Sequence, residues 1–345
     1  MTQTQRKIRI RAESHRLTKP FTISRGHKNT ADVVVVEIID GTRIGRGECV
    51  PYGRYGETLE SVTAEIESIK PMLEGISNKL SHTFTRDDLQ TAMHPGAARN
   101  AIDCALWDLE TQQSGQSVPD RLGLLPKPLP SAVTITLDTP ARMAQAAKQL
   151  LNKNSEKKQL VKVKLGGEDG FAADIGRLSA IQDAAPEATL IVDVNEGWHP
   201  HDIISHVDAL KSFNIDLIEQ PLPADNDDIL KEIDLPFCAD ESVHDCDDLN
   251  HLNPGYDCVN IKLDKTGGLT EALKMLQLAR EKNLKVMVGC MVASSLSMMP
   301  AYFLGLQADY VDLDGPIWLE KDRENGLHFT NYQVVLPTKP LWGWI

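Results

Sequence analysis

The sequence predicts an α/β fold: a (β/α)8-type, TIM-like barrel, or its (β/α)7β variant, with an N-terminal α+β capping domain. Two observations support this. The first part of the chain shows strand patterns followed by helical patterns. After a proline-rich segment, short apolar strands alternate with amphipathic helices, which is typical of a parallel barrel. An open doubly wound sheet is the alternative.

The capping domain is expected to contain strands first. Residues 7–11 alternate in polarity, and residues 31–39 are rich in β-branched side chains. The turn signal Asp40-Gly41 then leads into a second hairpin strand over 41–47. Helical periodicity follows at about 58–73, 85–93 and 97–113.

Prolines punctuate residues 123–130, so a helix cannot continue there and a domain boundary is expected. We predict a capping domain over 1–125 and a barrel domain over 126–319. The tail, 320–345, alternates again and is expected to return to the capping domain.

The barrel strands are expected at regular intervals, with the helices between them. The predicted strands are 132–137, 160–165, 189–194, 215–219, 236–240, 257–262, 285–289 and 309–313. The clearest predicted helices are 140–151, 170–184 and 269–282. The eighth helix is expected to be shortened or replaced.

Composition excludes several classes of function. The 345 residues are 41% hydrophobic and 25% charged, with a net charge of −13 and no Lys/Arg-rich run, which disfavours nucleic-acid binding. No apolar run approaches the length of a membrane span, and no signal sequence is recognisable. The six cysteines form no Cys-x-x-Cys pair, which indicates a reducing, cytoplasmic location. Assembly into a homo-oligomer is possible, and the sequence alone does not decide it.

Charged residues end five consecutive predicted strands. They are Lys164, Asp193, Glu219, Asp240 and Lys262. Catalytic residues of barrels project from the carboxyl ends of the strands, so these side chains are expected to converge. Three carboxylates without His or Cys suit Mg²⁺, and Asp193, Glu219 and Asp240 are the candidate ligands. Alternatively, each could cap the next helix or turn.

The lysines have the spacing of a two-base site. Lys162 and Lys164 face the same way on one strand, and a second ammonium beneath Lys164 would lower its pKa. Lys262 would approach a substrate from the opposite face. One lysine could remove a proton and the other return one, with the metal stabilising the enediolate of a carboxylate substrate. Ion-paired or solvated strand ends are the alternative.

Three further residues lie close in sequence to the predicted metal ligands and bases. Glu241 must point away from its neighbour Asp240, and we expect it to orient a lysine or a ligand. Asn195 is expected to support the same floor of the site. Lys265 is interpreted as a loop or helix-start residue.

Several motifs carry a resemblance to a known family. They include Gly47-Glu-Cys-Val-Pro-Tyr-Gly-Arg-Tyr-Gly-Glu57, Val161-Lys-Val-Lys164, Cys238-Ala-Asp-Glu-Ser242 and Asn260-Ile-Lys-Leu-Asp-Lys-Thr-Gly-Gly268. With these the chain resembles the muconate-lactonizing-enzyme subgroup of the enolase superfamily over nearly its whole length. Within it, the chain is most similar to dipeptide epimerases of the L-Ala-D/L-Glu type.

The resemblance implies roles for particular residues. Lys164 and Lys262 would be the acid/base catalysts, with Lys162 tuning Lys164. An Asp-x-Asp at the end of strand eight, Asp312 and Asp314, would hold the ammonium of the dipeptide.

At the other end of the substrate, Arg25 would meet the γ-carboxylate of a C-terminal glutamate. The loop from Tyr52 to Tyr55 would close over the substrate. The implied reaction is inversion at the α-carbon of Glu in L-Ala-L-Glu or L-Ala-D-Glu, in the metabolism of murein peptides. Extra residues at 152–158 are expected in a loop away from the site.

Other functions remain possible on the same scaffold. Cycloisomerisation of a muconate or dehydration to o-succinylbenzoate would use the same metal site and lysines, but not an anionic Asp-x-Asp. Other dipeptides are further alternatives. A barrel that only binds a peptide or a metal would have no use for the opposed lysines.

Overall fold

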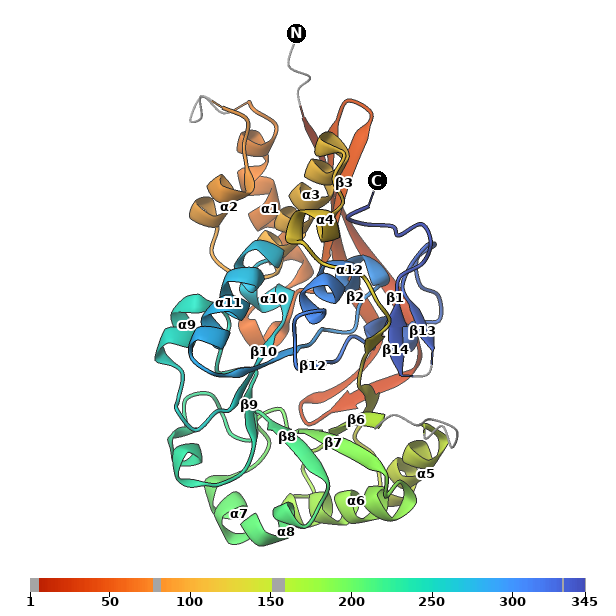
Figure 1. The fold of residues 1–345 in the computed structure, drawn as a ribbon, viewed down its shortest axis with the longest axis vertical. Coiled ribbons are helices and arrows are strands. Elements are labelled where there is room, and N and C mark those ends of the chain that lie inside the picture. Colours follow the sequence, from red (N-terminus) through yellow and green to blue (C-terminus); the bar gives the residue numbers. More distant parts are fainter. Residues whose placement is uncertain (1–5, 77–81, 151–158, 331, 345) are drawn as a thin grey trace.

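The computed structural model of this chain describes residues 6–76, 82–150, 159–330 and 332–344. The loop predicted at 152–158 lies outside the described residues. Figure 1 shows a capping domain with its helices and long strands beside a barrel, and both chain ends lie on the capping side. The predicted fold class is confirmed.

The capping sheet is antiparallel, in the order β1-β2-β3. Its strands are β1 (Lys7–Ile23), β2 (Gly26–Asp40) and β3 (Arg43–Cys49). The β1–β2 hairpin is much longer than the sequence predicted, and its turn at Ser24 and Arg25 reaches the barrel, where the backbone N–H of Leu137 donates to the carbonyl of Thr22 at 3.1 Å. This extension carries Arg25 to the barrel mouth.

Helices follow as predicted in the capping domain. They are η1 (Gly53–Tyr55), α1 (Leu59–Leu73), α2 (Arg86–Ala92), α3 (Ala97–Ser114) and α4 (Val118–Leu122). Thr58 and Thr85 cap α1 and α2 by accepting from the backbone N–H three residues on. Helix α3 lies directly on β3, and the glycines at positions 45 and 47 of β3 allow this close approach. A Cβ atom at Gly45 would overlap the carbonyl oxygen of Ala105, and one at Gly47 would overlap that of Ala101.

The barrel has eight parallel strands in sequential order from β5 to β12. They are β5 (Val133–Ile135), β6 (Gln159–Lys164), β7 (Ala188–Asp193), β8 (Ile215–Glu219), β9 (Phe237–Ala239), β10 (Cys258–Ile261), β11 (Lys285–Val288) and β12 (Tyr310–Val311). A 2.7 Å hydrogen bond from Ala132 N–H to the carbonyl of Val311 links the first strand to the last. All eight predicted strands are present.

Helices connect the barrel strands. They are α5 (Pro140–Leu150), α6 (Phe171–Ala184), α7 (Pro200–Ser205), α8 (Val207–Lys211), η2 (Asp228–Glu232), α9 (Cys246–His251), α10 (Leu263–Thr266), α11 (Leu269–Glu281), α12 (Ser295–Gly305) and η3 (Gly315–Trp318). The eighth helix is replaced by the short η3, as the sequence predicted.

The C-terminal segment packs against the capping domain. Its strands β13 (His328–Thr330) and β14 (Gln333–Val335) pair with each other, and β14 pairs with β4 (Leu129–Pro130). Trp342 is buried, and its indole N–H donates to the carbonyl of Arg46 at 2.8 Å. The domain boundary at residue 125 stays a prediction.

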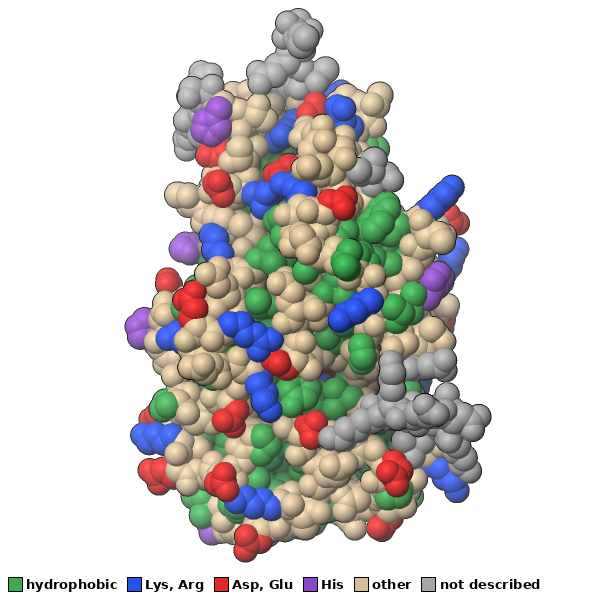
Figure 2. All heavy atoms as spheres, viewed as in Figure 1, with side chains coloured by type: hydrophobic (Ala, Val, Ile, Leu, Met, Phe, Trp, Pro, Cys, Tyr) green, Lys and Arg blue, Asp and Glu red, His purple; other side chains and the backbone are tan. Residues whose placement is uncertain are grey.

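The surface carries charged side chains of both signs. On the face shown in Figure 2, acidic and basic side chains are interspersed over the capping domain and the barrel. All six cysteines are free thiols. Among the described residues, none of the helices combines the length and apolarity needed to span a membrane.

Candidate active site

A cavity of about 330 Å³ lies at the carboxyl ends of the barrel strands, beneath the β1–β2 hairpin and η1. Ten of the twelve predicted site residues line it: Arg25, Tyr52, Lys162, Lys164, Asn195, Asp240, Glu241, Lys262, Asp312 and Asp314. The remaining two, Asp193 and Glu219, are fully buried, and both form ion pairs with Lys162, which lines the cavity. The structure therefore brings the whole predicted set together.

The three predicted metal ligands end adjacent strands β7 and β8 and follow β9. Lys162 Nζ lies 2.9 Å from Asp193 Oδ2 and 2.7 Å from Glu219 Oε2. Lys262 Nζ lies 2.5 Å from Asp240 Oδ2 and 3.9 Å from Glu219 Oε1. The carboxylates therefore form a continuous acidic floor bridged by ammonium groups.

These carboxylates differ in their pKa values. Burial, with repulsion from Asp193, raises the pKa of Glu219 to about 7. Burial alone would raise the pKa of Asp240, but Lys262 and Lys265 outweigh it and hold that pKa well below its usual range. Asp193 is likewise held low, because Lys162 and Lys164 outweigh its burial.

Within the described residues, no three Asp, Glu, His or Cys side chains are clustered closely enough to coordinate a metal as they stand. The reason is visible in the contacts, since the carboxylates point at lysine ammonium groups. Their chemistry nevertheless fits a hard cation: three buried carboxylates from neighbouring strands supply oxygen donors only. A cation bound there would take over contacts that the lysines now make.

The two predicted bases occupy opposite walls of the barrel. Lys164 ends β6 and Lys262 follows β10, and three strands separate β6 from β10 in the eight-stranded sheet. Lys164 donates to Asp193 and, at 3.2 Å, to Asn195 Oδ1. Both lysines line the cavity, so a molecule within it lies between them.

Lys162 is buried and lines the floor of the cavity. Besides its two floor carboxylates, its Nζ donates to Asp312 Oδ2 at 2.9 Å. Although burial opposes the charged form, these carboxylates raise the pKa of Lys162 well above its ordinary value. Its predicted effect on Lys164 stays a prediction.

Lys265 lies in the short helix α10, which agrees with its interpretation as a helix-start residue, and its side chain is fully buried. Its Nζ donates to Asp240 Oδ1 at 2.7 Å and to the carbonyls of Asp240, Val243 and Asn260 at 2.5, 2.9 and 3.0 Å. Lys265 thus holds one oxygen of Asp240 while Lys262 contacts the other.

One end of the cavity is rich in arginine. Arg25 donates to Glu241 Oε1 at 2.7 Å, to Tyr52 Oη at 3.0 Å and to Glu196 Oε2 at 3.2 Å. Glu241 therefore orients Arg25, and its predicted role toward a lysine or a ligand stays a prediction.

The other end is acidic. Asp314 Oδ2 accepts from the backbone N–H of Thr134 at 2.7 Å, and the buried Asp312 Oδ1 has no hydrogen-bond partner among the residues that the structure describes. Burial, together with repulsion from Asp312, raises the pKa of Asp314 to about 6. A cationic group would satisfy both side chains.

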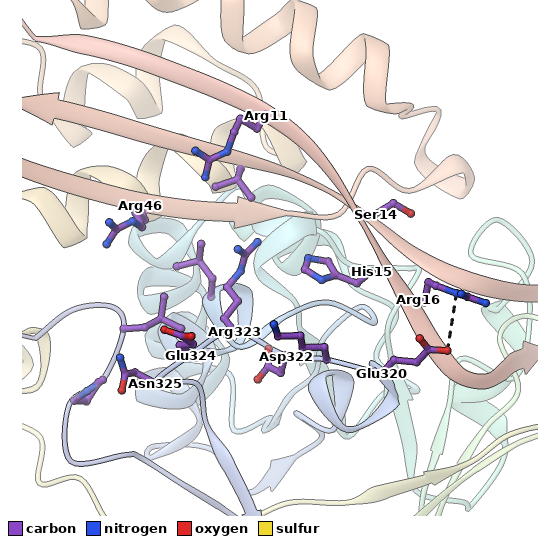
Figure 3. A pocket seen from close by; sticks show the side chains of 15 residues that line it. Arg11, Ser14, His15, Arg16, Arg46, Glu320, Asp322, Arg323, Glu324 and Asn325 are labelled. Atoms are coloured by element: carbon purple, nitrogen blue, oxygen red, sulfur yellow. Dashed lines mark ion pairs between the residues drawn. The ribbon is translucent and has the colours of Figure 1, made fainter.

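A larger cavity, about 820 Å³, lies away from these groups. Figure 3 shows Arg11, His15 and Arg46 on the strands of the capping sheet, opposite Arg323 from the segment after η3. Arg323 is bound to Glu13 and Glu48, at 2.8 and 2.5 Å. These contacts join the capping sheet to the C-terminal segment, so we interpret this cavity as a structural junction.

The sequence analysis missed three contributors. It named Tyr55 only as a loop end, yet Tyr55 lines the cavity and meets His244 edge-on, with ring centroids 4.6 Å apart. Arg54, beside it, also lines the cavity. Gln220, in a left-handed conformation with φ 37°, accepts from the backbone N–H of Asp240 at 2.9 Å and so fixes that residue. Only neighbouring motifs marked these positions in the sequence.

Comparisons with known proteins agree with this geometry. Residues 5–123 match the mandelate racemase / muconate lactonizing enzyme N-terminal domain, and residues 142–343 match the enolase C-terminal domain-like family. The chain is 42% identical to L-Ala-D/L-Glu epimerase of Escherichia coli (strain K12), covering 96% of this chain and 100% of that protein. It is also 42% identical to N-acetyl-D-glutamate racemase of Pseudoalteromonas sp, covering 90% and 95%.

Solved structures give the same result. An enolase family member from Agrobacterium tumefaciens, with bound sodium and L-Ala-L-Glu, is 45% identical and superposes with a TM-score of 0.89, covering 98% of this chain and 100% of that one. A dipeptide epimerase from Enterococcus faecalis V583, complexed with Mg and L-Leu-L-Tyr, is 28% identical with a TM-score of 0.87, covering 98% of each chain. This chain therefore belongs to the mandelate racemase / muconate lactonizing enzyme family of the enolase superfamily.

Proposed function

We propose that this protein is a Mg²⁺-dependent dipeptide epimerase that inverts the α-carbon of Glu in L-Ala-L-Glu and L-Ala-D-Glu. The observation that carries the proposal is the placement of Lys164 and Lys262 on opposite walls of one cavity. Inversion needs a proton acceptor on one face of the carbon and a proton donor on the other. Similarity to proteins with this activity supports the same reaction.

The chemistry balances with these two residues alone as proton carriers. One lysine, neutral at Nζ, takes the α-proton, and the electron pair left on the α-carbon spreads into the substrate carboxylate. The other lysine, protonated at Nζ, delivers its proton to the opposite face. In the reverse direction the two lysines exchange roles.

Asp193, Glu219 and Asp240 would hold the Mg²⁺ ion. When bound, the ion supplies positive charge that stabilises the carboxylate as negative charge develops on it. Lys162 and Lys265 hold the carboxylates from below, at Asp193 and Glu219 and at Asp240 respectively. Asn195 positions Lys164.

The ends of the cavity favour a dipeptide with a free ammonium and an acidic side chain. Asp312 and Asp314 supply two carboxylates for the α-ammonium. Arg25, oriented by Glu241 and Tyr52, supplies a guanidinium for the γ-carboxylate of Glu.

Racemisation of N-acetyl-glutamate is a second candidate, because one relative with 42% identity carries that name. An N-acetyl group is uncharged, whereas Asp312 and Asp314 place two carboxylates at that end of the cavity. The dipeptide is therefore the better fit.

The test is incubation of the purified protein with Mg²⁺ and L-Ala-L-Glu in D₂O. We expect the Glu α-proton to exchange and L-Ala-D-Glu to form, as followed by NMR and a chiral assay, and EDTA to abolish both. N-acetyl-L-glutamate serves as the competing substrate. Exchange with the acetylated compound alone would reject the dipeptide proposal.

The proposed setting is the catabolism or recycling of murein peptides, in which D-Glu occurs. Six free cysteines are consistent with work in a reducing compartment such as the cytoplasm.

A further inference from the structure

Glu196, at the arginine end of the cavity, carries a charge that the proposed reaction leaves unexplained. It contacts two arginines from different segments of the capping domain: Arg25 in the β1–β2 turn and Arg54 in η1. Glu196 and its neighbour Asn195 adopt left-handed backbone conformations, with φ of 68° and 48°. Asn tolerates this conformation, whereas it is unfavourable for Glu196, and backbone strain of this kind recurs at functional sites.

The two arginines bind Glu196 unequally. Arg54 Nε and Nη2 donate to the two carboxylate oxygens, both at 2.7 Å, which is the paired geometry that guanidinium and carboxylate favour. Arg25 makes a single contact with Glu196, at 3.2 Å. The stronger partner of Glu196 is therefore Arg54.

Arg25 has little capacity left for a ligand. Its Nη1 donates to Asn195 O and Glu196, and its Nη2 donates to Tyr52 Oη and Glu241. A substrate carboxylate could replace the long contact to Glu196 most easily. Glu196 would then repel that carboxylate unless another cation neutralised it.

We propose that Arg54 is a specificity-determining residue: by neutralising Glu196, it releases Arg25 to bind an anionic side chain of the dipeptide. This inference rests on the proposed function and names the residue that makes its acidic end work. Burial would raise the pKa of Glu196, but hydrogen bonds from Arg54 and Ala224 N–H outweigh it, so that pKa is lowered and Glu196 is a carboxylate at neutral pH. Arg54 itself is 41% exposed, so its replacement leaves the core intact.

The test compares two nearly isosteric substrates, L-Ala-L-Glu and L-Ala-L-Gln, which differ in one charge. Arg54→Met should raise the KM for the Glu dipeptide about tenfold more than the KM for the Gln dipeptide, because one uncompensated charge then faces the anion. Arg54→Lys, which keeps the charge, should change this ratio less. Arg142→Met, which removes a 75% exposed arginine on α5, is the matched control and should leave the ratio unchanged.

The double variant Arg54→Met/Glu196→Gln separates charge neutralisation from other roles. Removing both charges should restore the wild-type ratio of the two KM values. Parallel rises in both KM values for Arg54→Met would show a merely structural role and overturn the inference. A raised ratio that Glu196→Gln does not restore would show direct contact with substrate, and would also overturn it. Wild-type protein that epimerises no dipeptide would reject the proposed function itself, and the inference with it.

Discussion

Replacing Lys265 by methionine should destabilise the folded protein by about 3–5 kcal/mol, the usual cost of removing one partner from a buried ion pair. The Lys265 side chain is 0% exposed, and it is bound to Asp240 Oδ1 and to three backbone carbonyls. Methionine fills a similar volume but donates no hydrogen bond. Loss of the Lys265 ammonium therefore leaves a buried oxygen of Asp240 and three backbone carbonyls without their hydrogen-bond donor.

The free energy of unfolding is measured by denaturant titration at neutral pH in the presence of EDTA, so that metal binding does not contribute. Lys282→Met, at an exposed position at the end of α11, is the control and should change stability by less than about 0.5 kcal/mol. A loss below about 1 kcal/mol for Lys265→Met would refute the structural importance assigned to this ammonium.

Two further predictions concern stability. Burial raises the pKa of the Asp264 carboxyl group from an ordinary 3.8 to about 7. The folded state therefore keeps this carboxyl group protonated to a higher pH than the unfolded state does. The free energy of unfolding is expected to fall as the pH rises between these two values. Asp264→Asn keeps an oxygen that can accept from Val50 N and Asn100 Nδ2 but has no proton to lose, so it should make the free energy of unfolding less dependent on pH in this range. Denaturant titration at several pH values measures this, and a pH dependence equal to that of the wild type would contradict the prediction. Gly47→Ala should lower the free energy of unfolding by about 1–3 kcal/mol, because the added methyl group would overlap Ala101. Gly53→Ala is the control, since a methyl group there meets open space. Equal effects of the two substitutions in thermal melts would argue against close packing of α3 on β3.

The barrel and its charged strand ends could be predicted because both follow local rules. Short apolar strands recur between amphipathic helices, and parallel strands place their carboxyl ends at one edge. Asp193, Glu219 and Asp240 follow this rule, and so do Lys164 and Lys262. Their convergence at the carboxyl ends of the barrel strands required no knowledge of side-chain contacts.

The capping hairpin was harder to predict from the sequence. Residues 12–30 carry mostly polar, partly exposed side chains, so neither strand shows a strong apolar face. Their strand pairing depends on the partner strand and on contacts with the barrel, such as the bridge between Leu17 and Leu319. Long-range contacts of this kind leave little trace in local sequence.

Buried charge pairing was likewise beyond local reasoning. Lys265 follows Lys262 by one helical turn, and nothing in the segment Asp264-Lys-Thr-Gly-Gly268 distinguishes a solvated lysine from one beneath Asp240. Arg54 and Glu196 are 142 positions apart and meet only when the capping domain lies on the barrel.

The two-base mechanism is tested most directly by α-proton exchange in the single variants Lys164→Ala and Lys262→Ala. L-Ala-L-Glu and L-Ala-D-Glu are incubated separately with each variant and Mg²⁺ in D₂O, and exchange is followed by NMR. We predict that neither variant epimerises, and that each retains exchange at most with the diastereomer whose α-proton faces its remaining lysine. Epimerisation at the wild-type rate by both variants would contradict the mechanism.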